Sequence, residues 1–208
     1  MAAALLITFR ETLEASLVVA ITLTVLERIE QHRLHVAVWM GVLFGIVGSL
    51  VVAIAVRLFF STLPPHLHAI AEGATMLVAA ALIAWLVFWV TKVRGQVREH
   101  VTQRATDHAG RQSWWGICAM SFFAVVREGT ETVLFLQASF FQAQRVFSSA
   151  GAVLGVVLAV GLTALLFRGI HLLPLRWIFR VTSVLLLIFA ITLLVGGIGE
   201  LSEAGVFL

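Results

Sequence analysis

Six long apolar runs dominate this chain and restrict it to one class of fold. About 20 apolar residues in a helix are enough to cross the hydrocarbon core of a bilayer. A helix also satisfies its own backbone hydrogen bonds in lipid, and the runs lack the alternation of transmembrane β-strands. The pattern predicts an all-α integral membrane protein, with residues 1–208 as a single transmembrane domain. The six predicted transmembrane helices cover roughly 2–26, 36–60, 69–91, 114–141, 149–167 and 181–199.

The composition agrees with a protein surrounded by lipid. Hydrophobic residues make up 61% of the chain and charged residues only 12%, whereas a soluble domain carries about 25% charge. The net charge of +3 does not indicate a nucleic-acid partner, because the basic residues gather in the loops between apolar runs. The single cysteine, Cys118, lies inside an apolar run and excludes a disulfide framework.

The distribution of Lys and Arg predicts the orientation. Ten of these residues lie in the first, third and fifth loops, whereas the second and fourth loops contain only Arg145. Loops rich in Lys and Arg stay in the cytoplasm. We therefore expect a plasma or inner membrane protein with its N-terminus outside and the loop at about 93–113 in the cytoplasm.

Two of the predicted helices carry the same charged motif, Arg-Glu-x-x-Glu. It reads Arg10-Glu11-Thr12-Leu13-Glu14 in the first run and Arg127-Glu128-Gly129-Thr130-Glu131 in the fourth. Each such charge costs about 2.5–3.5 kcal/mol at the centre of a transmembrane helix, so intramembrane charges usually serve a function. Helical spacing places the three charged residues of a motif within an arc of about 100°. Oxygen-only ligands suit hard metal cations rather than Cu(I). We expect the four glutamates to be metal ligands, with Arg10 and Arg127 as supporting ion pairs.

The position of the motifs also predicts internal symmetry. About eight apolar residues precede the first motif and ten follow the second, which places both near the membrane midplane. The second and fifth runs each contain a small-xxx-small pair, Gly41/Gly45 and Gly151/Gly155, which permits close helix packing. Units of three helices have opposite orientations in the membrane. We predict two inverted three-helix repeats, at about 1–92 and 114–208.

Weaker candidates lie near the predicted outer face. Acidic residues there can attract cations, although each is equally an ordinary interfacial residue. A purely structural ion-pair network is the alternative for the motifs themselves, but it does not explain a second glutamate per arginine. The candidates for an outer funnel are Glu72, Glu200 and Glu203, together with His66 and His68 of a predicted loop.

At its two motifs the chain resembles the oxidase-dependent iron transporters, or high-affinity iron permeases. That family carries Arg-Glu-x-x-Glu in its first and fourth transmembrane helices. The resemblance extends to Glu72-Gly73, to Trp85 and Phe88-Trp89, to Leu173-Pro174-Leu175 and to the final Glu200-Leu-Ser-Glu203-Ala-Gly. Family members usually have seven spans, whereas this sequence shows six.

The resemblance implies a permease that imports iron, ferric or ferrous, with Glu11, Glu14, Glu128 and Glu131 as ligands. Iron is then the substrate, with no organic cofactor. It also implies a partner, either a multicopper oxidase or a periplasmic iron-binding or cupredoxin-like protein. The sequence leaves open a permease for lead or manganese. A membrane di-metal carboxylate enzyme is less favoured, because bundle di-iron sites use Glu-x-x-His and the histidines here lie in loops or at span ends.

Overall fold

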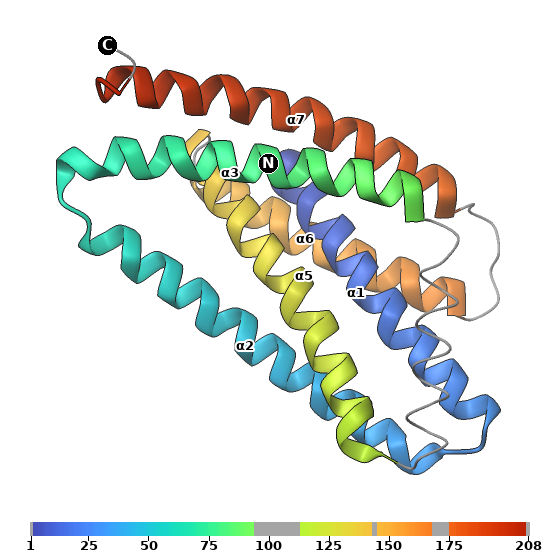
Figure 1. Cartoon of the computed structure of the whole chain (residues 1–208). Helices are drawn as coiled ribbons and strands as arrows, with labels where there is room; N and C mark the ends of the chain where they lie inside the picture. Colours follow the sequence, from blue (N-terminus) through green and yellow to red (C-terminus); the bar gives the residue numbers. More distant parts are fainter. Residues whose placement is uncertain (1, 94–112, 143–144, 168–174, 207–208) are drawn as a thin grey trace.

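Each apolar run of the sequence forms an α-helix in the computed structural model (Figure 1), which describes residues 2–93, 113–142, 145–167 and 175–206. This confirms the predicted all-α membrane fold, and within the described residues there are no strands. The helices extend beyond the apolar runs into the neighbouring polar residues. They are α1 (Ala2–Arg28), α2 (His35–Thr62), α3 (Pro65–Val93), α5 (Trp114–Gln142), α6 (Arg145–Phe167) and α7 (Leu175–Glu203), with a short 3₁₀ turn η1 (His32–Leu34) before α2.

The start of α3 corrects one expectation. His66 and His68 belong to the first turns of α3 rather than to a loop. Proline is favoured in the first turn of a helix, because its missing N–H is not needed there and its φ is already helical. Pro65 therefore begins the helix directly after the short turn that follows α2.

Four stretches of the described chain are long and apolar enough to cross a membrane on their own. They lie in α2, α3, α6 and α7. The helices α1 and α5 have similar lengths but contain the two charged motifs. Hydropathy therefore separates the four helices that can face lipid from the two that carry charges.

The helices pack in pairs, of which α1–α6 and α2–α5 are parallel and α3–α7 is antiparallel. Helix α1 packs along α6, α2 packs along α5 and α3 packs along α7, while α1 and α5 contact each other at the centre. Figure 1 shows α3 and α7 side by side and inclined across the other helices. Exchanging α1 with α5, α2 with α6 and α3 with α7 maps the α1–α6 pair onto the α2–α5 pair, and maps the α3–α7 and α1–α5 pairs onto themselves. This symmetry is what two inverted three-helix repeats produce.

Glycines allow the two equivalent pairs to approach closely. A Cβ at Gly45 of α2 would lie 2.7 Å from Val125 Cβ and 3.2 Å from the Phe122 carbonyl oxygen of α5. A Cβ at Gly155 of α6 would meet the Thr8 hydroxyl and lie 2.5 Å from the Leu5 carbonyl oxygen of α1. Val125 and Phe122 occupy the positions in α5 that Thr8 and Leu5 occupy in α1, counted from the motifs. The small-xxx-small pairs thus perform the predicted packing role at the same register in both halves.

Candidate metal site

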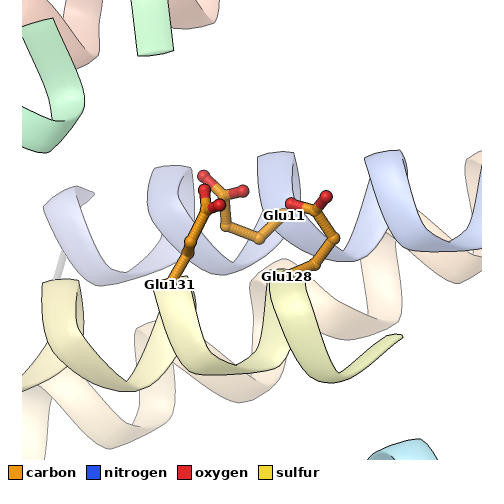
Figure 2. Close-up of side chains that lie close together, drawn as sticks. All are labelled: Glu11, Glu128 and Glu131. Atoms are coloured by element: carbon orange, nitrogen blue, oxygen red, sulfur yellow. The ribbon is translucent and has the colours of Figure 1, made fainter. Parts of the chain in front are cut away.

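The motifs meet where α1 and α5 cross. The two helices run antiparallel, so a motif in the middle of each comes to the same level. Figure 2 shows Glu11 of α1 facing Glu128 and Glu131 of α5. Glu128 and Glu131 are three residues apart and therefore lie on one face of their helix. This crossing collects acidic side chains that are far apart in the sequence.

Three carboxylates converge at the crossing. Each of Glu11, Glu128 and Glu131 offers an oxygen that lies within 4.8 Å of the oxygens of the other two. The side chain of Glu11 is fully buried, and those of Glu128 and Glu131 are 12% and 23% exposed. Oxygen ligands lie about 2.0–2.6 Å from a divalent cation, so ligands on opposite sides of the ion are about 4–5 Å apart. The three groups are therefore close enough to bind one cation.

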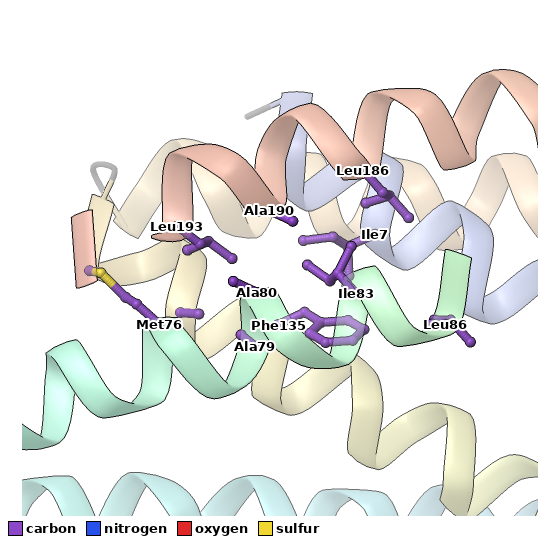
Figure 3. Close-up of a cluster of buried hydrophobic side chains, with 11 residues drawn as sticks. Ile7, Met76, Ala79, Ala80, Ile83, Leu86, Phe135, Leu186, Ala190 and Leu193 are labelled. Carbon is purple, nitrogen blue, oxygen red and sulfur yellow. The ribbon is translucent and has the colours of Figure 1, made fainter. Parts of the chain in front are cut away.

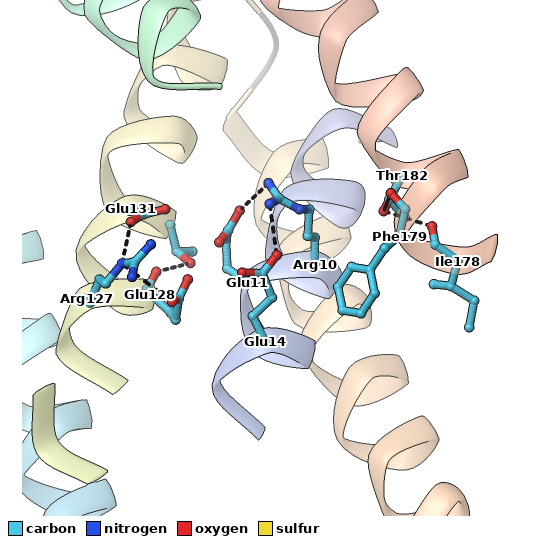
Figure 4. A network of polar contacts seen from close by, with 10 residues as sticks. Arg10, Glu11, Glu14, Arg127, Glu128, Glu131, Ile178, Phe179 and Thr182 are labelled. Carbon is cyan, nitrogen blue, oxygen red and sulfur yellow. Dashed lines mark hydrogen bonds and ion pairs between the residues drawn. The ribbon is translucent and has the colours of Figure 1, made fainter. Parts of the chain in front are cut away.

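Arg10 is fully buried and contacts both glutamates of its own motif (Figure 4). Its Nη1 donates a 3.3 Å hydrogen bond to Glu11 Oε1, and its Nη2 lies 2.8 Å from Glu14 Oε1. The second contact is an ion pair whose angles fall outside hydrogen-bond geometry. The sequence suggested one glutamate per arginine, but the guanidinium group lies between two carboxylates. Glu14 is consequently held by Arg10 and is not among the three converging acids.

Arg127 has different surroundings. Its Nε donates a 3.1 Å hydrogen bond to Glu131 Oε1 and lies 3.8 Å from Glu128 Oε1. The Arg127 side chain is 54% exposed, whereas that of Arg10 is 0% exposed. The two motifs are thus identical in pattern but unequal in burial.

Two oxygens of the converging carboxylates have unused acceptor capacity. Glu11 Oε2 and Glu128 Oε2 are buried and have no hydrogen-bond partner among the described residues. Leaving a buried polar atom without a partner costs about 1–3 kcal/mol, and more for a charged group. A cation between these carboxylates would satisfy both oxygens, because carboxylates are preferred ligands of hard cations.

The other acids named from the sequence lie elsewhere. Glu72 is near the start of α3, where its Oε1 lies 3.9 Å from His68 Nδ1. Glu200 and Glu203 end α7, and this end meets the start of α3, because a Cβ at Gly73 would lie 2.8 Å from Leu201 Cγ. These acids therefore gather at one end of the α3–α7 pair. The side chain of His66 lies outside the described residues.

The family resemblance includes Trp85, but sequence reasoning did not place Trp85 or its apolar neighbours beside the site. A cavity of about 420 Å³ adjoins it, lined by Leu82, Trp85 and Leu86 of α3 and by Arg127 and Glu131 of α5. Leu, Trp and Leu in an apolar helix give no signal that separates them from lipid-facing neighbours. Only the placement of α3 against α5 distinguishes them.

The chain matches known proteins along nearly its whole length. Residues 1–206 match the sequence profile described as the Iron permease FTR1 family. The chain is 36% identical over 205 residues to the ferrous iron permease EfeU of Yersinia pestis, covering 97% of this chain and 72% of the relative. Its identity to EfeU of Escherichia coli O157:H7 is also 36%, covering 97% of this chain and 74% of that relative. No solved structure matches the chain.

Proposed function

Because the chain belongs to the Iron permease FTR1 family, we propose that it carries iron across the membrane through the site formed by Glu11, Glu128 and Glu131. Family membership and the apolar helices make the chain a multi-pass membrane protein of the permease class. The site, its ligands and the direction of transport are the proposal. They rest on the geometry of the α1–α5 crossing.

The convergence of three carboxylates from two helices carries the proposal. A purely structural ion pair has no need for Glu11 and Glu128 to bring unpartnered oxygens into one buried place. Separating like charges would lower the energy, so their proximity favours a cation between them. Glu14 is the fourth glutamate of the two motifs. It lies outside the converging group and is the second carboxylate held by Arg10.

Charge balance favours the ferrous form of the substrate. The two motifs together contain four glutamates and two arginines, so the fully ionised set has a charge of −2. A divalent cation neutralises this charge, whereas a ferric ion leaves an excess positive charge in a low-dielectric region. The two relatives named above are also described as ferrous iron permeases. We propose Fe(II) as the transported species. Fe(III), manganese and lead are the alternative substrates, which the transport experiment below distinguishes.

We propose import, which the predicted orientation supports. With the loop at 93–113 in the cytoplasm, the end that carries Glu72, Glu200 and Glu203 faces outward. Acidic residues at that end raise the local cation concentration and steer iron toward the protein. They are also the surface at which an outer iron-delivering partner, an oxidase or a periplasmic iron-binding or cupredoxin-like protein, would dock.

Transport by the purified protein in liposomes tests the proposal. We expect Glu11→Gln and Glu128→Gln each to lower Fe(II) uptake at least about tenfold, since losing 1.4 kcal/mol of binding is a factor of ten. The matched control is Glu27→Gln, the same change at an exposed position of α1 outside the site. Unchanged uptake in both site variants would show that Glu11 and Glu128 are not ligands of the transported cation. Competition by Fe(III), Mn(II) and Pb(II) then identifies the cation.

A further inference from the structure

The site is closed on one side by an apolar cluster. Ile7 lies one turn from Glu11 toward the start of α1, and Phe135 lies one turn from Glu131 toward the end of α5. Both side chains are buried to 1% exposure or less. Figure 3 shows them packed with residues of α3 and α7. Their partners in the cluster include Met76, Ile83 and Leu193. Closely packed apolar side chains leave no space for a hydrated ion.

Beside Glu131 the site is open to the cavity of about 420 Å³. A water molecule occupies about 30 Å³ in the liquid, so this volume has room for a cation with a full shell of six waters. Glu131 belongs both to the lining of the cavity and to the group of three carboxylates. It therefore joins the site to the cavity.

The cavity lies toward the end of α3 that leads into residues 94–112. Its three α3 residues fall 7 to 11 positions before Val93 and at least 17 positions after Pro65. At about 1.5 Å per residue, the cavity begins about 10–17 Å from the former end and about 25 Å or more from the latter. Leu86 belongs both to the apolar cluster and to the cavity lining, so the cluster borders the cavity on the side toward the start of α3.

The exposure of the two arginines agrees with this arrangement. Arg127, at the cavity, is 54% exposed, and Arg10 is fully buried. A charged side chain at this depth is tolerated when it faces a water-filled cavity rather than lipid. The exposure of Arg127, like that of Leu82 and Trp85, shows that the cavity is open at the surface of the protein.

From these observations we propose that the cavity lined by Leu82, Trp85 and Leu86 is the route by which the cation leaves the site toward the 93–113 side, with Glu131 as the ligand that passes it on. This inference rests on the proposed transport function. In this conformation the site is closed toward the start of α3 by the apolar cluster and is accessible through the cavity. Trp85 lies two turns inside α3 as a wall of the route.

Cysteine accessibility tests the route without measuring transport. Cys118 is first changed to Ser, and then Leu82→Cys is compared with Ala84→Cys. Ala84 is the matched control, because it has nearly the same depth and is exposed, but lies about 160° around the helix from Leu82 and does not line the cavity. A charged, membrane-impermeant thiol reagent is applied to either face of sealed vesicles. Glu30→Cys and Ser61→Cys, both at exposed positions, mark the two faces.

We expect Leu82→Cys to react at least about tenfold faster than Ala84→Cys, and only from the face on which Glu30→Cys reacts. Equal rates, or reaction from the Ser61→Cys face, would overturn the proposed route. Because the readout is thiol modification, a failure of iron to bind would contradict the proposed function and leave this result standing.

A second variant tests whether the route carries the cation. Leu82→Trp fills part of the cavity, whereas Ala84→Trp adds the same side chain outside it. We expect Leu82→Trp to slow Fe(II) uptake at least about tenfold while equilibrium Fe(II) binding stays within about twofold of wild type. Normal uptake in Leu82→Trp, or an equal loss in Ala84→Trp, would contradict the route.

Discussion

Glu11 and Glu131 hold carboxylate oxygens within 4.8 Å of each other although they belong to opposite halves of the chain. Glu14 and Glu131 are the equivalent residues of the two motifs, yet only Glu131 joins Glu11 and Glu128. The two motifs therefore contribute unequally to one site. Because the two motifs contribute unequally, the same substitution is expected to have different effects at their glutamates and arginines.

The two glutamates of the first motif should differ in their effect on iron binding. Glu11→Gln removes a converging carboxylate, so we expect it to weaken Fe(II) binding at least about tenfold. Glu14→Gln leaves the three converging acids in place, and we expect a loss of no more than about threefold. Titration calorimetry on the purified protein measures both. A larger loss for Glu14→Gln than for Glu11→Gln would show that Glu14 is a primary ligand.

The two arginines should differ in their effect on stability. Arg10 places separate nitrogens against Glu11 and Glu14 while fully buried, and lysine cannot reproduce that fork. We expect Arg10→Lys to destabilise the protein by about 1–3 kcal/mol, the cost of a buried charged group left without its partner. Arg127 is half exposed, so Arg127→Lys should change stability by less than about 1 kcal/mol. Thermal unfolding in detergent compares the two, and equal shifts would contradict the asymmetry.

Two glycine substitutions should act in opposite directions. A Cβ at Gly45 would lie 2.7 Å from Val125 Cβ at the α2–α5 contact, so Gly45→Ala should cost about 1–3 kcal/mol through overpacking. A Cβ at Gly161 of α6 would have nothing within 4 Å. Gly161→Ala should therefore be neutral or stabilising by up to about 1 kcal/mol, because alanine is the better helix former. The midpoint of thermal unfolding should fall for the first variant only. A fall in both would show that the contact of the added Cβ is not what distinguishes the two positions.

A hydrogen bond between two helices offers a further test of the α1–α6 pair. Ser16 Oγ and Thr163 Oγ1 lie 2.7 Å apart. Hydrogen bonds between transmembrane helices contribute about 0.6 kcal/mol on average. A double-mutant cycle with Ser16→Ala and Thr163→Val should give a coupling of this size. Ser16→Ala with Thr24→Val is the control cycle, since Thr24 bonds the Ala20 carbonyl within α1, and its coupling should be near zero.

Much of the architecture was predictable from local sequence properties. Apolar runs such as 36–60 predict membrane helices wherever they fold, because lipid imposes the helix. The repeated Arg-Glu-x-x-Glu pattern predicted both halves of the candidate site. The spacing of Gly41 and Gly45 predicted close packing, which the contacts with α5 confirm. The start of α3 was less accurate, because Pro65 extends that helix over His66 and His68.

The sequence by itself determined the helices, the charged residues within them and their spacing along each helix, because these depend on neighbours only three or four positions away. Only the tertiary structure decided which carboxylates converge, that Arg10 lies between two of them, and that Leu82, Trp85 and Leu86 line a cavity. These relationships depend on how α1, α3 and α5 cross. The crossing is set by side-chain contacts between distant segments, which no local pattern contains. Two motifs of the same pattern thus acquire unequal surroundings, the first buried and the second open to the cavity.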